Sequence, residues 1–330
     1  NQGGSLTEVT ANSGLAGRSG WWNSLAAADL DQDGDVDYVA GNFGENIYFQ
    51  CSAGEPIRVY GKDLDANGMV DPLISCYWRD SLGEKHEYLY HPRQDLVKQF
   101  VGIRKKFNTY GEYGEATVQD MFSEEELAGA TILSANWMRS VALENLGNGR
   151  FEIHPLPPAA QLAPLYGILP SDVDGDGRLD LLLTGNDFGM EVQQGRADAL
   201  TGLVLRNDGQ WGFTPLSPAE SRFIVPGDAR GLARLAAADG RELVLATQNR
   251  DSLRVFRLEQ PVPKQFISLQ AGEVKAVYYL AGGGKRLEEF YPGSGFMSQR
   301  GRYVVKTADV VRIEFLNGKG AVTREIGEGL

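Results

Sequence analysis

The stretch Asp172-Val-Asp-Gly-Asp-Gly-Arg-Leu-Asp180 runs without a gap into the apolar residues Leu181-Leu-Leu183. Its carboxylates stand at positions one, three, five and nine, and a glycine stands at position six. Calcium prefers about six to eight oxygen ligands, and alternate residues of a tight loop can direct several carboxylates to one centre. The glycine permits the sharp turn that wraps such a loop around an ion. The stretch, called loop 3 below, therefore predicts a calcium-binding loop that leads into a strand.

The same spacing occurs twice more, closer to the N-terminus. Loop 1, Asp29-Leu-Asp-Gln-Asp-Gly-Asp-Val-Asp37, precedes Tyr38-Val-Ala40, and loop 2, Asp63-Leu-Asp-Ala-Asn-Gly-Met-Val-Asp71, precedes Pro72-Leu-Ile74. These β-type exits differ from an EF-hand, which closes on a bidentate glutamate and is flanked by helices. We therefore expect about three calcium sites, each pinning a turn between two strands. Three solvated Asp/Gly turns are the alternative.

The composition favours an all-β protein. The 41 glycines among 330 residues indicate many turns between short strands. The formal net charge is −12, and the three loops supply 12 of the 44 acidic residues, so much of the acidity belongs to the predicted metal sites. This charge argues against a nucleic acid as the main partner. No apolar run reaches the length of a transmembrane segment. Cys51 and Cys76 allow either one disulfide or two buried thiols.

Short strand candidates recur around the acidic loops with a period of about 40–50 residues, and four short strands per repeat predict a β-propeller blade. Stacked blades bury the sheet faces that one blade leaves open. We predict that residues 1–258 form such blades. The first unit contains loop 1, and the others are a unit that starts at loop 2 and closes with 140–151, a third over 166–216 and a fourth over 224–258. The fourth has no acidic loop, and we predict no metal there.

A helix-containing insertion at about 79–136 interrupts the second unit. Apolar residues recur at spacings of three and four between positions 95 and 107, which predicts an amphipathic helix. Ser123-Glu-Glu-Glu126 has the pattern of a capping box that opens a short helix. We interpret this insertion either as the segment that contacts a partner or as a lid over a blade edge.

The pattern changes after Pro261-Val-Pro263. Strand-like runs follow at 274–280, 288–291, 303–306, 310–316 and 321–326. The dipeptide Asn317-Gly318 predicts a hairpin turn between the last two runs. We therefore predict a small separate β-module over residues 259–330.

The three loops, each followed by a strand, resemble the FG-GAP/VCBS repeats, which form the calcium-loop propeller of integrin α subunits. Residues 143–151 and 205–209 also resemble the second half of a blade in that family. The tail segments 288–298 and 311–319 resemble an ASPIC/UnbV module, which often follows such repeats in exported bacterial proteins. Integrin-like propellers have seven blades, whereas four units are recognised here, so we expect further blades upstream of Asn1; the alternative is that some blades are too degenerate to recognise.

The resemblance implies that calcium is bound by side chains at loop positions one, three, five and nine and by the backbone carbonyl at position seven. Carried over to loop 1, the ligands are Asp29, Asp31, Asp33, Asp35 and Asp37. Those in loop 2 are Asp63, Asp65, Asn67, Met69 and Asp71, and those in loop 3 are Asp172, Asp174, Asp176, Arg178 and Asp180.

The sequence contains no signature of a catalytic site. It has no H-E-x-x-H, no G-x-S-x-G and no P-loop, and its three histidines show no metal-ligand spacing. We therefore expect a non-catalytic calcium-binding propeller that is periplasmic, cell-surface or secreted and binds a protein or a glycan. The alternative is a polysaccharide-acting hydrolase or lyase that uses the propeller as its scaffold. An RNA-binding function is a third possibility, and the acidic charge argues against it. The oligomeric state stays open.

Overall fold

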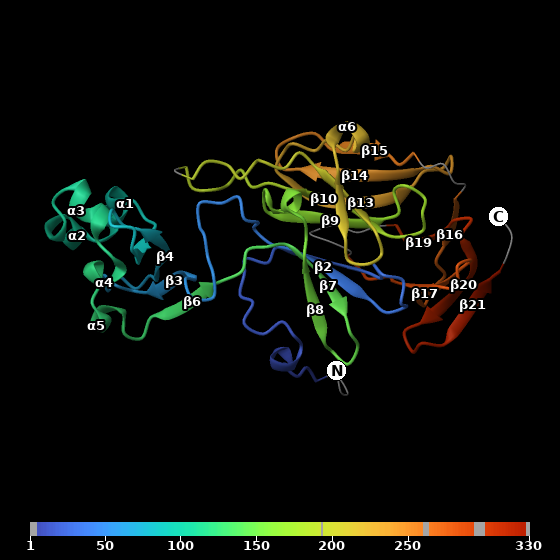
Figure 1. The fold of residues 1–330 in the computed structure, drawn as a ribbon, viewed down its shortest axis with the longest axis horizontal. Coiled ribbons are helices and arrows are strands. Elements are labelled where there is room, and N and C mark those ends of the chain that lie inside the picture. Colours follow the sequence, from blue (N-terminus) through green and yellow to red (C-terminus); the bar gives the residue numbers. More distant parts are fainter. Residues whose placement is uncertain (1–4, 193, 260–263, 294–300, 328–330) are drawn as a thin grey trace. The chain divides into compact units, whose positions relative to one another are not determined.

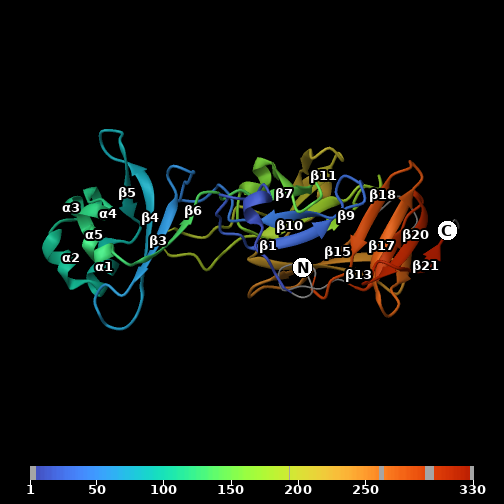
Figure 2. The same ribbon diagram turned by 90° about the horizontal axis from the view of Figure 1, so that it is seen from below.

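The computed structural model describes residues 5–192, 194–259, 264–293 and 301–327. The chain forms two compact units (Figures 1 and 2). The main unit contains the residues up to Ala16, residues 22–47 and those from Arg139 onward, and the inserted unit contains residues 17–21 and 48–138. Strands make up 40% and helices 12%, and among the described residues the strands form several antiparallel sheets, none of them closed. The prediction of an all-β fold is confirmed at this level.

The first sheet of the main unit has the order β1-β2-β7-β8, with bounds Ser24–Ala28, Asp37–Gly41, Val141–Asn145 and Phe151–Pro155. Loop 1 joins β1 to β2. β7 pairs with β2, placing Leu143 opposite Tyr38, so our expectation that 140–151 closes the unit of loop 2 was wrong. The inserted unit separates β2 from β7 in the chain. Local patterns report the periodicity of a strand but not its partner.

The second sheet repeats this arrangement with the order β9-β10-β11-β12, bounded by Leu165–Ser171, Asp180–Gly185, Leu203–Asn207 and Phe213–Leu216. Loop 3 joins β9 to β10. All residues of β10 are buried, as the continuous apolar run after the loop indicates. In the described part of the chain, the third sheet consists of β13 (Ala229–Ala236), β14 (Glu242–Gln248) and β15 (Arg254–Arg257). The short helix η1 (Thr10–Asn12) precedes β1, and the connections between the sheets carry η2 (Pro158–Gln161) and α6 (Pro218–Ser221).

Two hydrophobic cores join these three sheets in chain order. Leu181 and Leu183 of β10 pack in one core with residues of the first sheet, such as Val39. Leu182, between them, packs in the next core with residues of the third sheet, such as Val244. Alternate residues of a strand point to opposite faces. The second sheet is therefore covered on one face by the first sheet and on the other by the third.

The C-terminal module has a core of its own and belongs to the main unit. Its larger sheet has the order β18-β17-β20-β21, with bounds Lys285–Glu289, Glu273–Leu280, Val310–Asn317 and Val322–Ile326. β16 (Gln265–Ser268) pairs with β19 (Tyr303–Lys306). Four of these strands match the predicted runs to within one residue at each end, whereas β18 lies at 285–289 instead of 288–291 and β16 was not predicted. Pro261–Pro263 and the end of the 288–298 segment lie outside the described residues.

The inserted unit combines one sheet with short helices. Its sheet has the order β5-β4-β3-β6, with bounds Lys85–Leu89, Asp71–Arg79, Ile57–Lys62 and Thr131–Ala135. The helices gather on one side of this sheet (Figure 2): α1 (Arg93–Gln99), α2 (Val101–Lys106), α3 (Tyr110–Glu115), α4 (Val118–Met121) and α5 (Glu124–Leu127). Loop 2 joins β3 to β4. The unit begins at Tyr48 rather than near residue 79, so loop 2 belongs to it and not to the main unit.

The amphipathic segment 95–107 forms two helices rather than one. α1 ends and α2 begins at Phe100, whose backbone is extended with φ −120° and ψ 93°. The Phe100 ring packs edge-on against Phe122, with ring centroids 5.6 Å apart. Leu96 and Ile103 are buried, as the apolar spacing predicts. Aromatic packing at Phe100 therefore outweighs the continuity of the helix.

Two further expectations for the inserted unit are decided by its structure. Ser123 forms the predicted capping box: its hydroxyl accepts from the Glu126 N–H at 3.2 Å, and the Glu126 carboxylate accepts from the Ser123 N–H at 2.7 Å. Cys51 and Cys76 are not joined by a disulfide, and of the expected two buried thiols only Cys76 is buried, whereas Cys51 is half-buried. Burial raises the pKa of Cys76 to about 12, so this thiol is unreactive at neutral pH.

Candidate metal centres

The carboxylate at position one of loops 1 and 3 organises the loop backbone. Asp29 accepts from the N–H groups of Gln32 at 2.8 Å and Gly34 at 3.1 Å. Asp172 accepts from the equivalent N–H groups of Gly175 at 2.6 Å and Gly177 at 3.2 Å. Since an Asp side chain readily bonds backbone a few residues ahead, the motif itself closes these turns.

The carboxylate at position nine ties the loop to the third strand of its sheet. Asp37 accepts from Leu30 N–H and Asn145 N–H, both at 2.9 Å. In loop 3, Asp180 accepts from Val173 N–H and from Asn207 N–H, again at 2.9 Å. The two sheets thus share one hydrogen-bond plan. Asn145 and Asn207 lie in the segments that resemble a half-blade, but the sequence does not indicate that their N–H groups bind the closing aspartates.

Two positions of each loop have left-handed backbone. Position six was expected to need glycine, and Gly34, Gly68 and Gly177 have φ of 95°, 87° and 89°. Position four was not foreseen: Gln32, Ala66 and Gly175 have φ of 66°, 58° and 84°. Side chains with a Cβ rarely adopt such angles, so loops 1 and 2 hold a strained residue at position four.

Each loop brings three carboxylates together. One oxygen from each member lies within 4.8 Å of the others in the sets Asp29, Asp31, Asp33; Asp63, Asp65, Asp71; and Asp172, Asp174, Asp180. The implied ligands Asp35, Asp37 and Asp176 are not in these sets. Asn67, Met69 and Arg178 offer no carboxylate. The Arg178 guanidinium binds the Asp176 carboxylate and donates to the Asn207 carbonyl at 3.0 Å, so only its backbone carbonyl is suited to a cation.

The donor chemistry of loops 1 and 3 fits a hard cation. Asp35 Oδ1 is buried without a hydrogen-bond partner among the described residues, and a cation would satisfy such an acceptor. Burial raises the pKa of Asp29, Asp37 and Asp180 to about 7, and it also raises the pKa of Asp172. Grouped buried carboxylates are costly to ionise unless a positive charge is present. Oxygen-only donors select calcium or magnesium over softer metals.

Loop 2 has the same spacing in a different setting. Asp63 accepts from Gly68 N–H at 2.8 Å, as in the other loops, but its second donor is the Asn67 N–H at position five, at 3.1 Å, rather than the N–H at position four. Its closing residue Asp71 accepts from Leu64 N–H at 2.9 Å and from the Gln99 amide of α1. A helix thus takes the place that a strand asparagine holds in the main unit.

The structure also assembles two mixed clusters that sequence spacing did not reveal: Asp80, Glu84, His86 and Glu144, Glu152, His154. In the second cluster, β7–β8 pairing sets Glu144 directly opposite Glu152. His154 Nε2 lies 2.6 Å from Glu144 Oε2, and its ring stacks on Trp211 at 4.7 Å. Nitrogen and oxygen donors of this kind suit a transition metal, and they equally form plain ion pairs.

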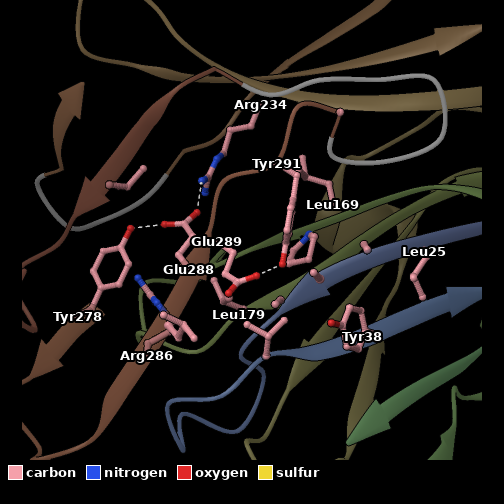
Figure 3. Close-up of a pocket in the computed structure, with 18 residues that line it drawn as sticks. Leu25, Tyr38, Leu169, Leu179, Arg234, Tyr278, Arg286, Glu288, Glu289 and Tyr291 are labelled. Atoms are coloured by element: carbon pink, nitrogen blue, oxygen red, sulfur yellow. Dashed lines mark hydrogen bonds and ion pairs between the residues drawn. The ribbon is translucent and has the colours of Figure 1, made fainter. Parts of the chain in front are cut away.

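A cavity of about 400 Å³ lies in the main unit beside loops 1 and 3 (Figure 3). Leu25 and Tyr38 of the first sheet form one side, and residues of β18 form the other. Glu288 binds Tyr278 and Arg234, and Glu289 binds Tyr291. Both carboxylates in this cavity are therefore engaged by neighbours.

A second cavity, of about 660 Å³, lies within the inserted unit and is rich in aromatic residues. Tyr48 and Trp78 lie edge to face with ring centroids 5.2 Å apart, and Trp78 stacks on Tyr88 at 6.4 Å. Tyr48 is 59% exposed. Asp80 and His86 add polar groups to the wall, with His86 Nε2 3.5 Å from Asp80 Oδ2.

No protein-family model matches this chain, and the search of curated proteins finds no match. Within the described part of the chain, no helix has the length and apolar character needed to cross a membrane.

Proposed function

We propose that this chain is a non-catalytic calcium-binding protein whose main unit consists of propeller blades of the FG-GAP/VCBS type, followed by an ASPIC/UnbV-like module. The observation that carries the proposal is the shared plan of the first two sheets. Each has an acidic loop between its first two strands, and each closing aspartate, Asp37 or Asp180, binds a backbone N–H of the third strand at 2.9 Å. Two copies of one local architecture on consecutive, mutually packed sheets are typical of blades.

The proposed ion is calcium, bound at an affinity of about micromolar to millimolar. In loops 1 and 3, the ion neutralises carboxylates that burial makes costly to ionise, and so stabilises the turn between two strands. Sites at the weak end of this range fill only where free calcium is abundant. This supports a periplasmic, cell-surface or secreted location.

The proposed partner is a glycan or the glycan of a glycoprotein, held in the aromatic cavity of the inserted unit. Tyr48 and Trp78 offer ring faces to the apolar face of a sugar, and Asp80 and His86 supply hydrogen-bond partners for its hydroxyls. A segment inserted between β2 and β7 leaves the sheets undisturbed, and loops on a rigid scaffold commonly carry recognition. These features support the interpretation that the insertion contacts a partner more than the interpretation that it is a lid over a blade edge.

A glycan panel tests this function. We expect the full chain to bind one class of glycan without releasing product, and we expect Trp78→Ala to lower that affinity at least 10-fold. Tyr291→Ala, in the other cavity, is the matched control and should leave the affinity unchanged. Product formation would favour the polysaccharide-acting alternative, whose candidate carboxylates Glu288 and Glu289 line that other cavity. If Tyr291→Ala lowers the affinity and Trp78→Ala does not, the glycan site lies in the cavity of the main unit instead.

A further inference from the structure

The C-terminal module touches loop 1 through the backbone of β18. The Leu287 N–H donates to Asp29 Oδ2 at 2.8 Å, across 258 residues of sequence. The same oxygen accepts from Gly34 N–H at 3.1 Å. Asp29 is fully buried. A residue of the module therefore helps to hold the carboxylate at position one, which organises the turn of loop 1.

The module touches loop 3 through two side chains. Arg286 Nη1 donates to the Gly177 carbonyl at 2.8 Å in a buried contact. Asp309, in the turn between β19 and β20, lies so close that a Cβ added to Gly177 would stand 2.6 Å from its Oδ2. The position that carries the left-handed glycine of loop 3 is thus enclosed by the module.

The two loops are also joined to each other. The Gln32 amide of loop 1 donates to the same Gly177 carbonyl at 2.9 Å. The side chain of Asn207, whose backbone binds Asp180, donates to Leu30 O of loop 1 at 2.7 Å. Loop 1, loop 3 and β18 therefore form one hydrogen-bonded junction in the main unit.

Arg286 is held firmly at this junction. It is 7% exposed, and its guanidinium lies 4.5 Å from the centroid of the Tyr278 ring. The Tyr278 hydroxyl in turn binds Glu288, which pairs with the buried Arg234 (Figure 3). A side chain fixed by stacking and by a buried network loses little further freedom when it supports a ligand site.

We propose that the C-terminal module is a structural part of both metal sites of the main unit, with Arg286 and Leu287 as positioning residues for loops 1 and 3. The proposal rests on the calcium binding proposed above. β18 holds both loops in the conformation that binds the ion, and by thermodynamic reciprocity the bound ions hold the module in place. Loop 2 lies in the other unit and should bind calcium independently of the module.

Calcium titration of the full chain, followed by calorimetry, tests the proposal. We expect Arg286→Ala to weaken two of three sites about 10-fold or more and to leave the third unchanged. Arg312→Ala is the matched control: Arg312 belongs to β20 of the same sheet and stacks on Tyr279 at 3.8 Å. It should leave all three sites unchanged. Tighter binding by Arg286→Ala would show that the guanidinium acts only as a repelling charge, and would overturn the proposal.

Hydrogen exchange of the unmodified protein gives a second test that needs no variant. Chelation should raise exchange in peptides covering Leu287, whose N–H is bonded to Asp29, far more than in β21 of the same sheet. Equal exchange of β18 with and without calcium would refute the coupling while leaving the calcium sites intact. If the titration finds no calcium at any loop, both this inference and the proposed function are wrong.

Discussion

Loops 1 and 3 of the main unit and loop 2 of the inserted unit share one sequence spacing but have different surroundings. Val36 of loop 1 is 8% exposed, whereas its loop 2 counterpart Val70 is 67% exposed. The glycine at position six shows the same contrast. A Cβ added to Gly177 would stand 2.6 Å from Asp309 Oδ2, whereas a Cβ added to Gly68 would have no neighbour within 4 Å. The motif alone is sufficient for the turn, and packing around it decides how strongly the turn is coupled to the fold.

The comparison also explains why the loops differ in their closing contact. Asp37 and Asp180 bind strand asparagines of their own sheets, while Asp71 binds Gln99 of a helix. The N–H groups of Asn145 and Asn207 fix loops 1 and 3 to the third strand of the sheet that contains each loop. The Gln99 side chain fixes loop 2 only to the neighbouring helix α1. We therefore expect calcium to stabilise the two units unequally.

Removal of calcium should have the largest effect. A ligand at about 100 times its Kd stabilises the folded state by roughly 2.7 kcal/mol per site. With two loops in the main unit and one in the inserted unit, chelation should destabilise the main unit about twice as much. Differential scanning calorimetry, with hydrogen exchange to assign each transition, measures this. Equal losses in both units would contradict the asymmetry.

Substitution of the glycine at position six should have the next largest effect and should separate the loops most clearly. Gly177→Val places a β-branched residue at φ 89° and sets its Cβ 2.6 Å from Oδ2 of Asp309, a half-exposed side chain that has to shift, so we expect a loss of roughly 2–3 kcal/mol. Gly68→Val meets the same backbone strain at φ 87° but no neighbour within 4 Å, so its cost should be about 1–2 kcal/mol. Urea unfolding measures both. Similar losses would show that packing around Gly177 is unimportant.

Removal of one carboxylate should affect one site only. Asp174→Ala should weaken the loop 3 site. It should lower the free energy of unfolding by about 2 kcal/mol when calcium is present, and change it little after chelation. Asp65→Ala is the matched change at position three of loop 2, and it should weaken the site in the inserted unit instead. Calorimetric counting of calcium ions checks both variants. If Asp174→Ala still binds at the same three sites, the assignment of ligands is wrong.

The pH dependence should be the smallest effect. Burial raises the pKa of Asp29, Asp37 and Asp180 from 3.8 to about 7 in the folded protein. The stability linked to these protons is fully present below about pH 4 and is lost as the pH rises through 7. After chelation, the main unit should therefore melt a few degrees lower at pH 7.5 than at pH 5. Calcium should reverse this trend, since it binds the ionised carboxylates. A chelated protein that gains stability over this range would disprove the effect.

Local features were predictable because their causes lie within a few residues. The nine-residue spacing places Asp172 where its oxygens meet the N–H groups of Gly175 and Gly177, and these bonds need no other part of the chain. The capping box at Ser123 was predictable for the same reason. The strand runs after each loop were evident from apolar β-type residues.

Pairing and packing were not predictable, because they depend on residues far apart in sequence. Asp37 meets Asn145 across 108 residues, and β7 belongs with β2 only because the inserted unit folds separately. The break at Phe100 likewise reflects packing against Phe122 rather than helical periodicity. The histidine clusters are closer in sequence, but they too depend on strand pairing, since the register of β7 and β8 sets Glu144 opposite Glu152.

The sequence by itself determined the acidic turns, the glycines that shape them and the strands that follow, since short-range hydrogen bonds and backbone sterics depend only on neighbouring residues. Only the tertiary structure decided that loops 1 and 3 meet each other and β18, while loop 2 stands in a different unit. That outcome depends on how whole sheets bury their apolar faces, and no nine-residue pattern encodes it.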